Sequence, residues 1–110
     1  MYVYALRDVE TLQCRYVGVT ANPQGRLKNH VSHCHDSNAS KKEWIQGSNY
    51  KVYMEILQYL DVYPSNRLER ETWWILEMLR RGEPITNVVV SPGIKITPNL
   101  REAMNTRIGH

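Results

Sequence analysis

The sequence predicts a small α+β domain in which a three-stranded, mainly antiparallel sheet is flanked by helices. Short segments rich in Tyr and Val near the N-terminus predict the first strands. A long segment with helical periodicity and helix-boundary residues follows the last strand-like segment. The 110 residues, 42% of them hydrophobic, suffice for one such domain. The expected order is strand, strand, helix, short helix, strand, helix, with a short C-terminal extension.

Residues 2–7 and 13–19 are the first two predicted strands. The loop between them is short, so we expect an antiparallel hairpin. The second strand contains Gly18, and a glycine inside a strand often marks the close approach of another group. Tyr2 and Tyr4 share one face of the sheet, where paired tyrosines usually indicate packing.

Two helical segments are expected after the hairpin. Asn22 is a favoured N-cap and Pro23 a favoured first helical residue, which predicts a helix from about 23 to 34. Residues 41–46 form a short helical turn that Gly47 ends.

The third strand and the longest helix complete the predicted domain. Residues 51–59 are predicted to form a strand in which Val52, Met54 and Ile56 face the same side. Asn66 and Glu69 have the spacing of a capping box, and Gly82 stops the helix, which is therefore expected over 67–81.

The boundary of the domain is placed at residue 90. We expect a domain over 1–90 and a basic C-terminal extension over 91–110. In the extension, a Ser-Pro-Gly turn lies within either a small hairpin or an extended arm. Three apolar residues at helical spacing then predict a last short helix, and these are Leu100, Met104 and Ile108.

Composition excludes several classes of protein. No apolar stretch approaches 18 residues, which excludes a membrane span, and the N-terminus lacks the features of a secretory signal. Two cysteines, Cys14 and Cys34, are too few for a disulfide scaffold, so we expect a reduced, intracellular protein. A net charge of +3 is compatible with nucleic-acid binding but does not by itself indicate it.

Glu71 departs from the pattern of the long helix. The apolar arc of this helix comprises Leu68, Trp74, Ile75, Leu76, Met78 and Leu79. Glu71 lies inside that arc, between Leu68 and Ile75. A carboxylate there must be paired, bound to a metal or protonated, because an isolated buried charge is costly. On the helix alone, an ion pair at the edge of the core is the simpler interpretation.

The first helix carries a cation and an imidazole on one face. Arg26 and His30 are four residues apart, and His33 follows one turn later. Taken alone, they indicate a solvated polar flank. His30, His33, Cys34 and His35 crowd one helix end, whereas structural zinc sites usually take ligands from two separated segments. This cluster therefore does not predict zinc.

In their order along the chain, these residues resemble the motifs of the GIY-YIG nuclease superfamily. Val3-Tyr4 matches the end of the first motif and Tyr16-Val17-Gly18 the second. Arg26 followed by His30 resembles the pattern of the first helix. In the long helix, the resemblance places the family's metal-binding glutamate at Glu71, not Glu69.

Two further positions bear on this resemblance. Asn87 lies where the family ends its core with an asparagine. Tyr2 stands where the first motif has glycine, a departure that bears on substrate fit more than on chemistry. The resemblance covers residues 2–88, and its five motifs are individually short but occur in register.

The resemblance implies a Mg²⁺-dependent DNA endonuclease that cuts a phosphodiester by in-line attack of water. Glu71 would be the protein ligand to one Mg²⁺ or Mn²⁺ ion, which keeps most of its shell as water and phosphate oxygen. Tyr4 would accept the proton of the attacking water, directly or through a relay. Because the ordinary pKa of tyrosine is about 10, a nearby cation must lower it, and Arg26 is the candidate.

The remaining site residues take supporting roles under the same resemblance. Arg26 would also bind the scissile phosphate. Tyr16 would orient the water or the phosphate, and His30 would bond the phosphate or a tyrosine hydroxyl. Gly18 and Asn87 are expected to support the site.

The implied partner is double-stranded or branched DNA. His33, Arg101 and Arg107 are candidate DNA contacts, and the last helix either docks on the domain or grips DNA through its two arginines. Double-strand cleavage would require a homodimer or sequential binding. We expect a cytoplasmic or nucleoid-associated protein that acts in a phage, homing, restriction or repair setting.

Two other functions remain open on the sequence. The first is a non-catalytic nucleic-acid-binding module on the same fold. The sequence contains the complete set of Tyr4, Tyr16, Arg26, His30 and Glu71. This argues against a non-catalytic module, because a site that no longer catalyses a reaction would not need all five. The second is a protein-interaction domain with an exposed Trp73, which predicts no dependence on metal or DNA.

Overall fold

The computed structural model of the protein describes residues 1–32, 38–62, 65–91 and 94–106. Its elements are β1 (Tyr2–Asp8), β2 (Cys14–Thr20), α1 (Pro23–Ser32), α2 (Ala39–Gly47), β3 (Val52–Tyr59), α3 (Arg67–Arg80), β4 (Val89–Ser91), β5 (Ile94–Lys95) and α4 (Pro98–Thr106). The predicted fold class is confirmed. The last predicted residues of the first helix, 33 and 34, lie outside the described residues.

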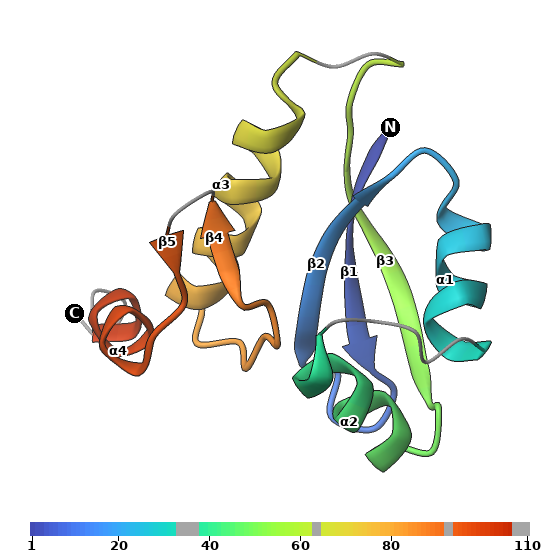
Figure 1. The fold of residues 1–110 in the computed structure, drawn as a ribbon, viewed down its shortest axis with the longest axis horizontal. Coiled ribbons are helices and arrows are strands. Elements are labelled where there is room, and N and C mark those ends of the chain that lie inside the picture. The colour runs from blue at the N-terminus through green and yellow to red at the C-terminus, as the bar shows by residue number, and fades with distance from the viewer. Residues whose placement is uncertain (33–37, 63–64, 92–93, 107–110) are drawn as a thin grey trace.

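The main sheet has the strand order β2-β1-β3, and both pairings are antiparallel. The central strand β1 sends alternate side chains to opposite faces. Val3 and Ala5 pack in one core with residues of α3, whereas Tyr4 and Leu6 pack in another with Trp44 of α2. Figure 1 shows the resulting three layers, with α3 on one side of the sheet and α1 and α2 on the other.

A β-bulge in β3 changes which of its residues face the cores. Val3 pairs with Gln58 and Tyr4 with Ile56, so Leu57 is an additional residue in the strand. The offset turns Leu57 toward the α3 core, and Ile56 stays 45% exposed. Val52, Met54 and Ile56 face the same side of the sheet, as predicted, because they pair with Asp8, Leu6 and Tyr4, alternate residues of β1.

Helix α3 buries Ile75, Met78 and Leu79 as predicted. Leu68 was predicted in the same arc but is 53% exposed, because the core covers only the later turns of the helix. The prediction of a capping box is also wrong: Asn66 is the N-cap, but its side chain makes no cap hydrogen bond. Gly82 ends the helix with φ 79°, in the left-handed region that glycine adopts readily.

The C-terminal extension docks on the α3 side of the domain. β4 and β5 pair as an antiparallel hairpin, which confirms the hairpin interpretation over the extended arm. Leu100 of α4 packs against the α3 core. The Arg101 guanidinium donates hydrogen bonds to the carbonyls of Glu83 and Ile85 at 3.3 and 2.9 Å. No helix in the described part of the chain is both long and apolar enough to cross a membrane.

Candidate active site

The site begins with a close approach between two neighbouring strands. Tyr4 of β1 pairs with Gly18 of β2, and the tyrosine ring lies directly over the glycine. A Cβ atom at position 18 would lie 2.5 Å from Tyr4 Oη and 2.6 Å from Cζ. Only glycine leaves room for this ring, which explains the glycine that the sequence places inside a strand.

Tyr4 and Tyr16 form a cluster with His30 on the face of the sheet covered by α1 and α2. Tyr4 Oη lies 2.9 Å from His30 Nε2, within hydrogen-bond distance. The Tyr16 ring centroid is 6.3 Å from that of Tyr4 and 5.6 Å from that of His30. The structure thus brings three predicted site residues together from β1, β2 and α1.

Helix α1 presents His30 and Arg26 from one anchored segment. The Asn22 side chain accepts a hydrogen bond from the backbone N–H of Gly25 at 3.2 Å, and it caps the helix as predicted. Leu27 packs against the core that contains Tyr4. Arg26 is exposed, and none of the described residues pairs with its guanidinium, which is therefore available to an anionic ligand.

Lys41 is a member of this cluster that the sequence did not predict. Its side chain is only 2% exposed, and its Nζ lies 4.4 Å from the centroid of the Tyr16 ring, over the ring face. One feature of the sequence did indicate that Lys41 is buried. Lys41 precedes Trp44 by three residues and Ile45 by four, and this spacing places all three on the buried face of α2.

Glu71 lies on α3, on the opposite face of the sheet from the tyrosine cluster (Figure 1). Burial raises the pKa of its carboxyl group, and the charge of Arg67 opposes this effect only in part. Within the described ranges, no residue forms an ion pair or hydrogen bond with this carboxylate. Among the described residues, the expected ion pair at the core's edge is therefore not found, and the carboxylate forms no hydrogen bond with Tyr4, Tyr16 or His30.

Gln58 fixes the turn of α3 that carries Glu71. Its side-chain oxygen accepts hydrogen bonds from Arg70 Nε and Trp74 Nε1, both at 3.0 Å. These donors flank Glu71 in the helix, so β3 holds this turn from both sides. Neither periodicity nor motif indicated this role for Gln58.

The segment after α3 runs along the outer edge of β2. Asn87 bonds both backbone groups of Val17 at 2.9 Å, accepting from its N–H and donating to its carbonyl. The backbone N–H of Thr86 donates to the carbonyl of Arg15. Asn87 thus fixes the backbone of β2 at Val17, the residue between Tyr16 and Gly18.

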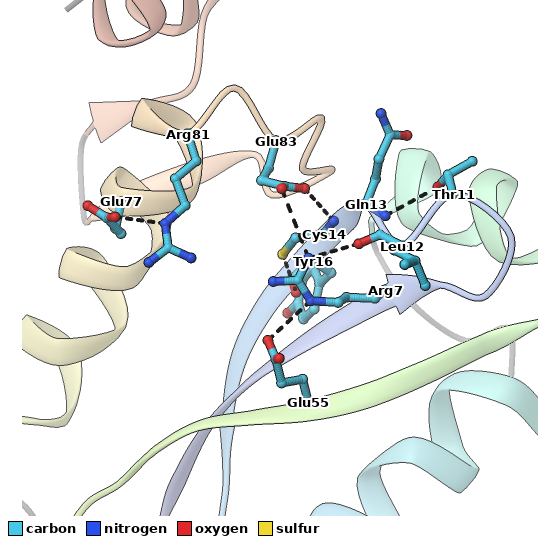
Figure 2. Close-up of polar contacts among 10 residues, drawn as sticks. All are labelled: Arg7, Thr11, Leu12, Gln13, Cys14, Tyr16, Glu55, Glu77, Arg81 and Glu83. Atoms are coloured by element: carbon cyan, nitrogen blue, oxygen red, sulfur yellow. Dashed lines mark hydrogen bonds and ion pairs between the residues drawn. The ribbon is translucent and has the colours of Figure 1, made fainter. Parts of the chain in front are cut away.

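At the start of β2, a polar network closes the same edge (Figure 2). The Glu83 carboxylate accepts a hydrogen bond from the backbone N–H of Cys14 and lies 4.0 Å from Arg7 Nη1. Arg7 Nε in turn pairs with Glu55 of β3 at 3.1 Å. Burial raises the pKa of the Cys14 thiol to about 12, so Cys14 is a structural residue and not a reactive one.

Tyr2, which replaces the glycine of the first motif, has a neighbour of its own. Its ring centroid is 5.1 Å from that of Tyr59 on β3, and the two residues pair across the strands. The departure therefore adds an aromatic pair next to Tyr4 along β1 and leaves the contacts of Tyr4 intact. Of the predicted DNA contacts, His33 and Arg107 lie outside the described residues.

A single carboxylate is the donor that this site offers to a metal. No group of three His, Cys, Asp or Glu side chains among the described residues is arranged to hold a metal ion. Mg²⁺ retains several waters and is commonly bound through one or two carboxylates. Glu71 is a half-buried carboxylate with no ion-pair partner in the described part of the chain, so the residues present fit the ion that the fold family implies.

Fold and site together define an α+β domain with a tyrosine–histidine cluster built over a strand glycine. The family model of the GIY-YIG catalytic domain matches residues 1–83. The chain therefore belongs to the GIY-YIG nuclease family. No curated protein and no solved structure gives a significant match. Asn87 lies beyond the matched residues.

Proposed function

We propose that the protein is a divalent-metal-dependent DNA endonuclease that hydrolyses phosphodiester bonds by in-line attack of an activated water. The observation that carries the proposal is the 2.9 Å contact between Tyr4 Oη and His30 Nε2. It supplies a phenol hydroxyl with a hydrogen-bond partner that can take its proton. Membership of a nuclease family supports the same reaction.

The proton path uses both partners of that contact. As the water oxygen bonds to phosphorus, the water proton passes to Tyr4 Oη, and the phenol proton of Tyr4 passes to His30 Nε2. This requires the histidine tautomer whose resting proton is on Nδ1. Because the two transfers are coupled, Tyr4 need not be ionised in the resting enzyme, which removes the difficulty of its high ordinary pKa.

Arg26 and Glu71 act on the two sides of the phosphate. The exposed guanidinium of Arg26, one turn before His30, binds the non-bridging oxygens of the scissile phosphate. Glu71 would hold one Mg²⁺ or Mn²⁺ ion, and the charge of that ion would stabilise the leaving 3′-oxygen. Substrate would thus be held by residues of both α1 and α3.

Cleavage of supercoiled plasmid tests the proposal. We expect nicking that requires a divalent metal, and loss of nicking in Glu71→Ala with DNA binding retained. Glu69→Ala is the matched control, because Glu69 is an exposed carboxylate on the same helix. Tyr4→Phe and Arg26→Ala should each slow cleavage by roughly 10²–10⁴-fold. Metal-dependent nicking by Glu71→Ala at the wild-type rate would remove the metal role of Glu71.

Binding without cleavage in any divalent metal would instead support the non-catalytic module. Double-strand breaks need two strand cuts, and one site makes one cut at a time. We therefore expect nicked circles to appear first and linear plasmid to increase with protein concentration.

A further inference from the structure

The β-bulge in β3 determines which of its residues lies beside the proposed site. Ile56, before the bulge, pairs with Tyr4, so uninterrupted alternation would place Gln58 opposite Tyr2. Because the bulge adds one residue, Tyr2 pairs with Tyr59 instead. Bulges next to active sites commonly redirect a side chain in this way. Tyr59 therefore lies on the same face of the sheet as Tyr2 and Tyr4.

The two aromatic rings form an exposed surface at this position. The ring centroids of Tyr2 and Tyr59 are 5.1 Å apart. Tyr59 is nevertheless 58% exposed, so much of its surface is open to solvent. The contact with Tyr2 restricts the Tyr59 ring in the free protein, which reduces the entropy that a ligand must remove when it binds there.

This aromatic pair lies next to the proposed proton acceptor. Tyr2 and Tyr4 are two residues apart on one face of β1, a separation of about 7 Å along the strand. Helix α1 begins at Pro23, three residues after Thr20, which pairs with Tyr2 in the sheet. Figure 1 shows the N-terminus and the start of α1 at the same end of the sheet. Arg26, the proposed phosphate ligand, is in the first turn of this helix.

We infer that Tyr2 and Tyr59 form a stacking site for one unpaired base of the DNA, in the nucleotide next to the scissile phosphate. Proteins that hold single-stranded nucleic acid combine basic side chains with aromatic rings on which bases stack. A base inside a duplex is already stacked on both sides, so this site selects DNA that has an unpaired nucleotide beside the cut. The inference rests on the proposed function and narrows its substrate. It depends on a departure from the family, because the first motif has glycine where this chain has Tyr2.

The first experiment measures binding without metal, by fluorescence anisotropy of labelled DNA. Three duplexes are compared: one fully paired, one with a single bulged dT, and one in which the bulged nucleotide is abasic. We expect wild type to bind the bulged dT about 5- to 150-fold more tightly than the abasic duplex. Tyr59→Leu should bind these two duplexes equally, whereas Tyr59→Phe, which keeps the ring, should retain the difference.

Tyr50→Leu is the matched control, because Tyr50 is also an exposed tyrosine, at 43%, but precedes β3 at its opposite end. It should discriminate between the two bulged duplexes as wild type does. The abasic duplex removes the base without any change in the protein, so a folding defect cannot produce the expected difference. Since Tyr59 is exposed, Tyr59→Leu should also keep the wild-type Tm, as differential scanning fluorimetry would show.

Cleavage provides the second measurement. With a divalent metal, wild type should cut beside the bulged dT with a higher kcat/KM than it cuts the fully paired duplex. In Tyr59→Leu the ratio of these two values should fall close to one, and in Tyr50→Leu it should match wild type.

Three results overturn the inference. The first is equal binding of the bulged dT and the abasic duplex by wild type, and the second is discrimination that persists in Tyr59→Leu. The third is a wild-type dimer that Tyr59→Leu dissociates in light scattering without a change in DNA binding, because the rings would then contact a second copy of the chain. Failure of the proposed function is separate: wild type would cleave none of the duplexes but would still distinguish the bulged dT from the abasic nucleotide.

Discussion

Replacement of Gly18 by alanine tests the geometry of the tyrosine cluster most directly. The new Cβ would lie 2.5 Å from Tyr4 Oη, about 1 Å inside ordinary van der Waals contact. The ring cannot swing away, because Tyr4 is 1% exposed and packed against Leu6, Trp44 and Ile45. Alanine normally stabilises a strand relative to glycine by roughly 0.5–1 kcal/mol. Overpacking costs about 1–3 kcal/mol and therefore outweighs this gain.

The expected result is a lower Tm together with lost activity. At roughly 4 °C per kcal/mol for a domain of this size, the Tm should fall by about 4–10 °C. A shift of Tyr4 Oη by about 1 Å would also break its 2.9 Å contact with His30, so cleavage should slow by roughly 10²-fold or more. Differential scanning fluorimetry and plasmid nicking measure the two effects.

Gly47→Ala is the matched control, because a Cβ at position 47 meets no atom within 4 Å. It should leave both Tm and cleavage close to wild type. A Gly18→Ala protein with wild-type Tm would refute the steric reasoning. A destabilised Gly18→Ala protein that cleaves at the wild-type rate would remove Tyr4 from the proton path.

Three further predictions follow from individual side chains. Burial raises the pKa of Glu71, so the folded state binds this proton more tightly and loses stability as the pH rises above the ordinary range of glutamate. Glu71→Gln should therefore raise the Tm at neutral pH but not near pH 4, and an equal gain at both would contradict this. Cys14, with a pKa of about 12, should resist iodoacetamide in the native protein and react only on unfolding, as peptide mass spectrometry would show; rapid native labelling would be the contrary result. Asn87→Ala leaves the backbone groups of Val17 unpaired and should cost roughly 1–3 kcal/mol in urea unfolding, whereas a loss below about 0.5 kcal/mol would mean that water replaces the side chain.

Periodicity and boundary residues predicted the elements because these signals are local. Pro23 after Asn22 and Gly82 after the long helix each act within one turn, and the observed helices begin and end beside them. The errors arise where tertiary packing determines which residues are buried. A helical wheel shows that Leu68 lies on the apolar side, but not that the core ends before reaching it.

The residues of the site could be predicted only where the resemblance to the family indicated which of them act together. Tyr4 and His30 are 26 residues apart and come from different elements, so no spacing rule joins them. Lys41 was missed because it lies in a polar stretch of sequence, where a charged residue indicates solvent. Its burial depends on how α2 packs on the sheet, which only the structure shows.

One segment of the chain connects the two elements α3 and β2, which carry residues of the proposed site. Gly82 reverses the chain at the end of α3, and residues 83–87 then run back along the free edge of β2. This segment thus links the helix that carries Glu71 to the strand that carries Tyr16. Arg101 of α4 donates to two carbonyls of the same segment. The C-terminal extension lies beyond the residues that match the family, and it therefore helps to hold this segment in place.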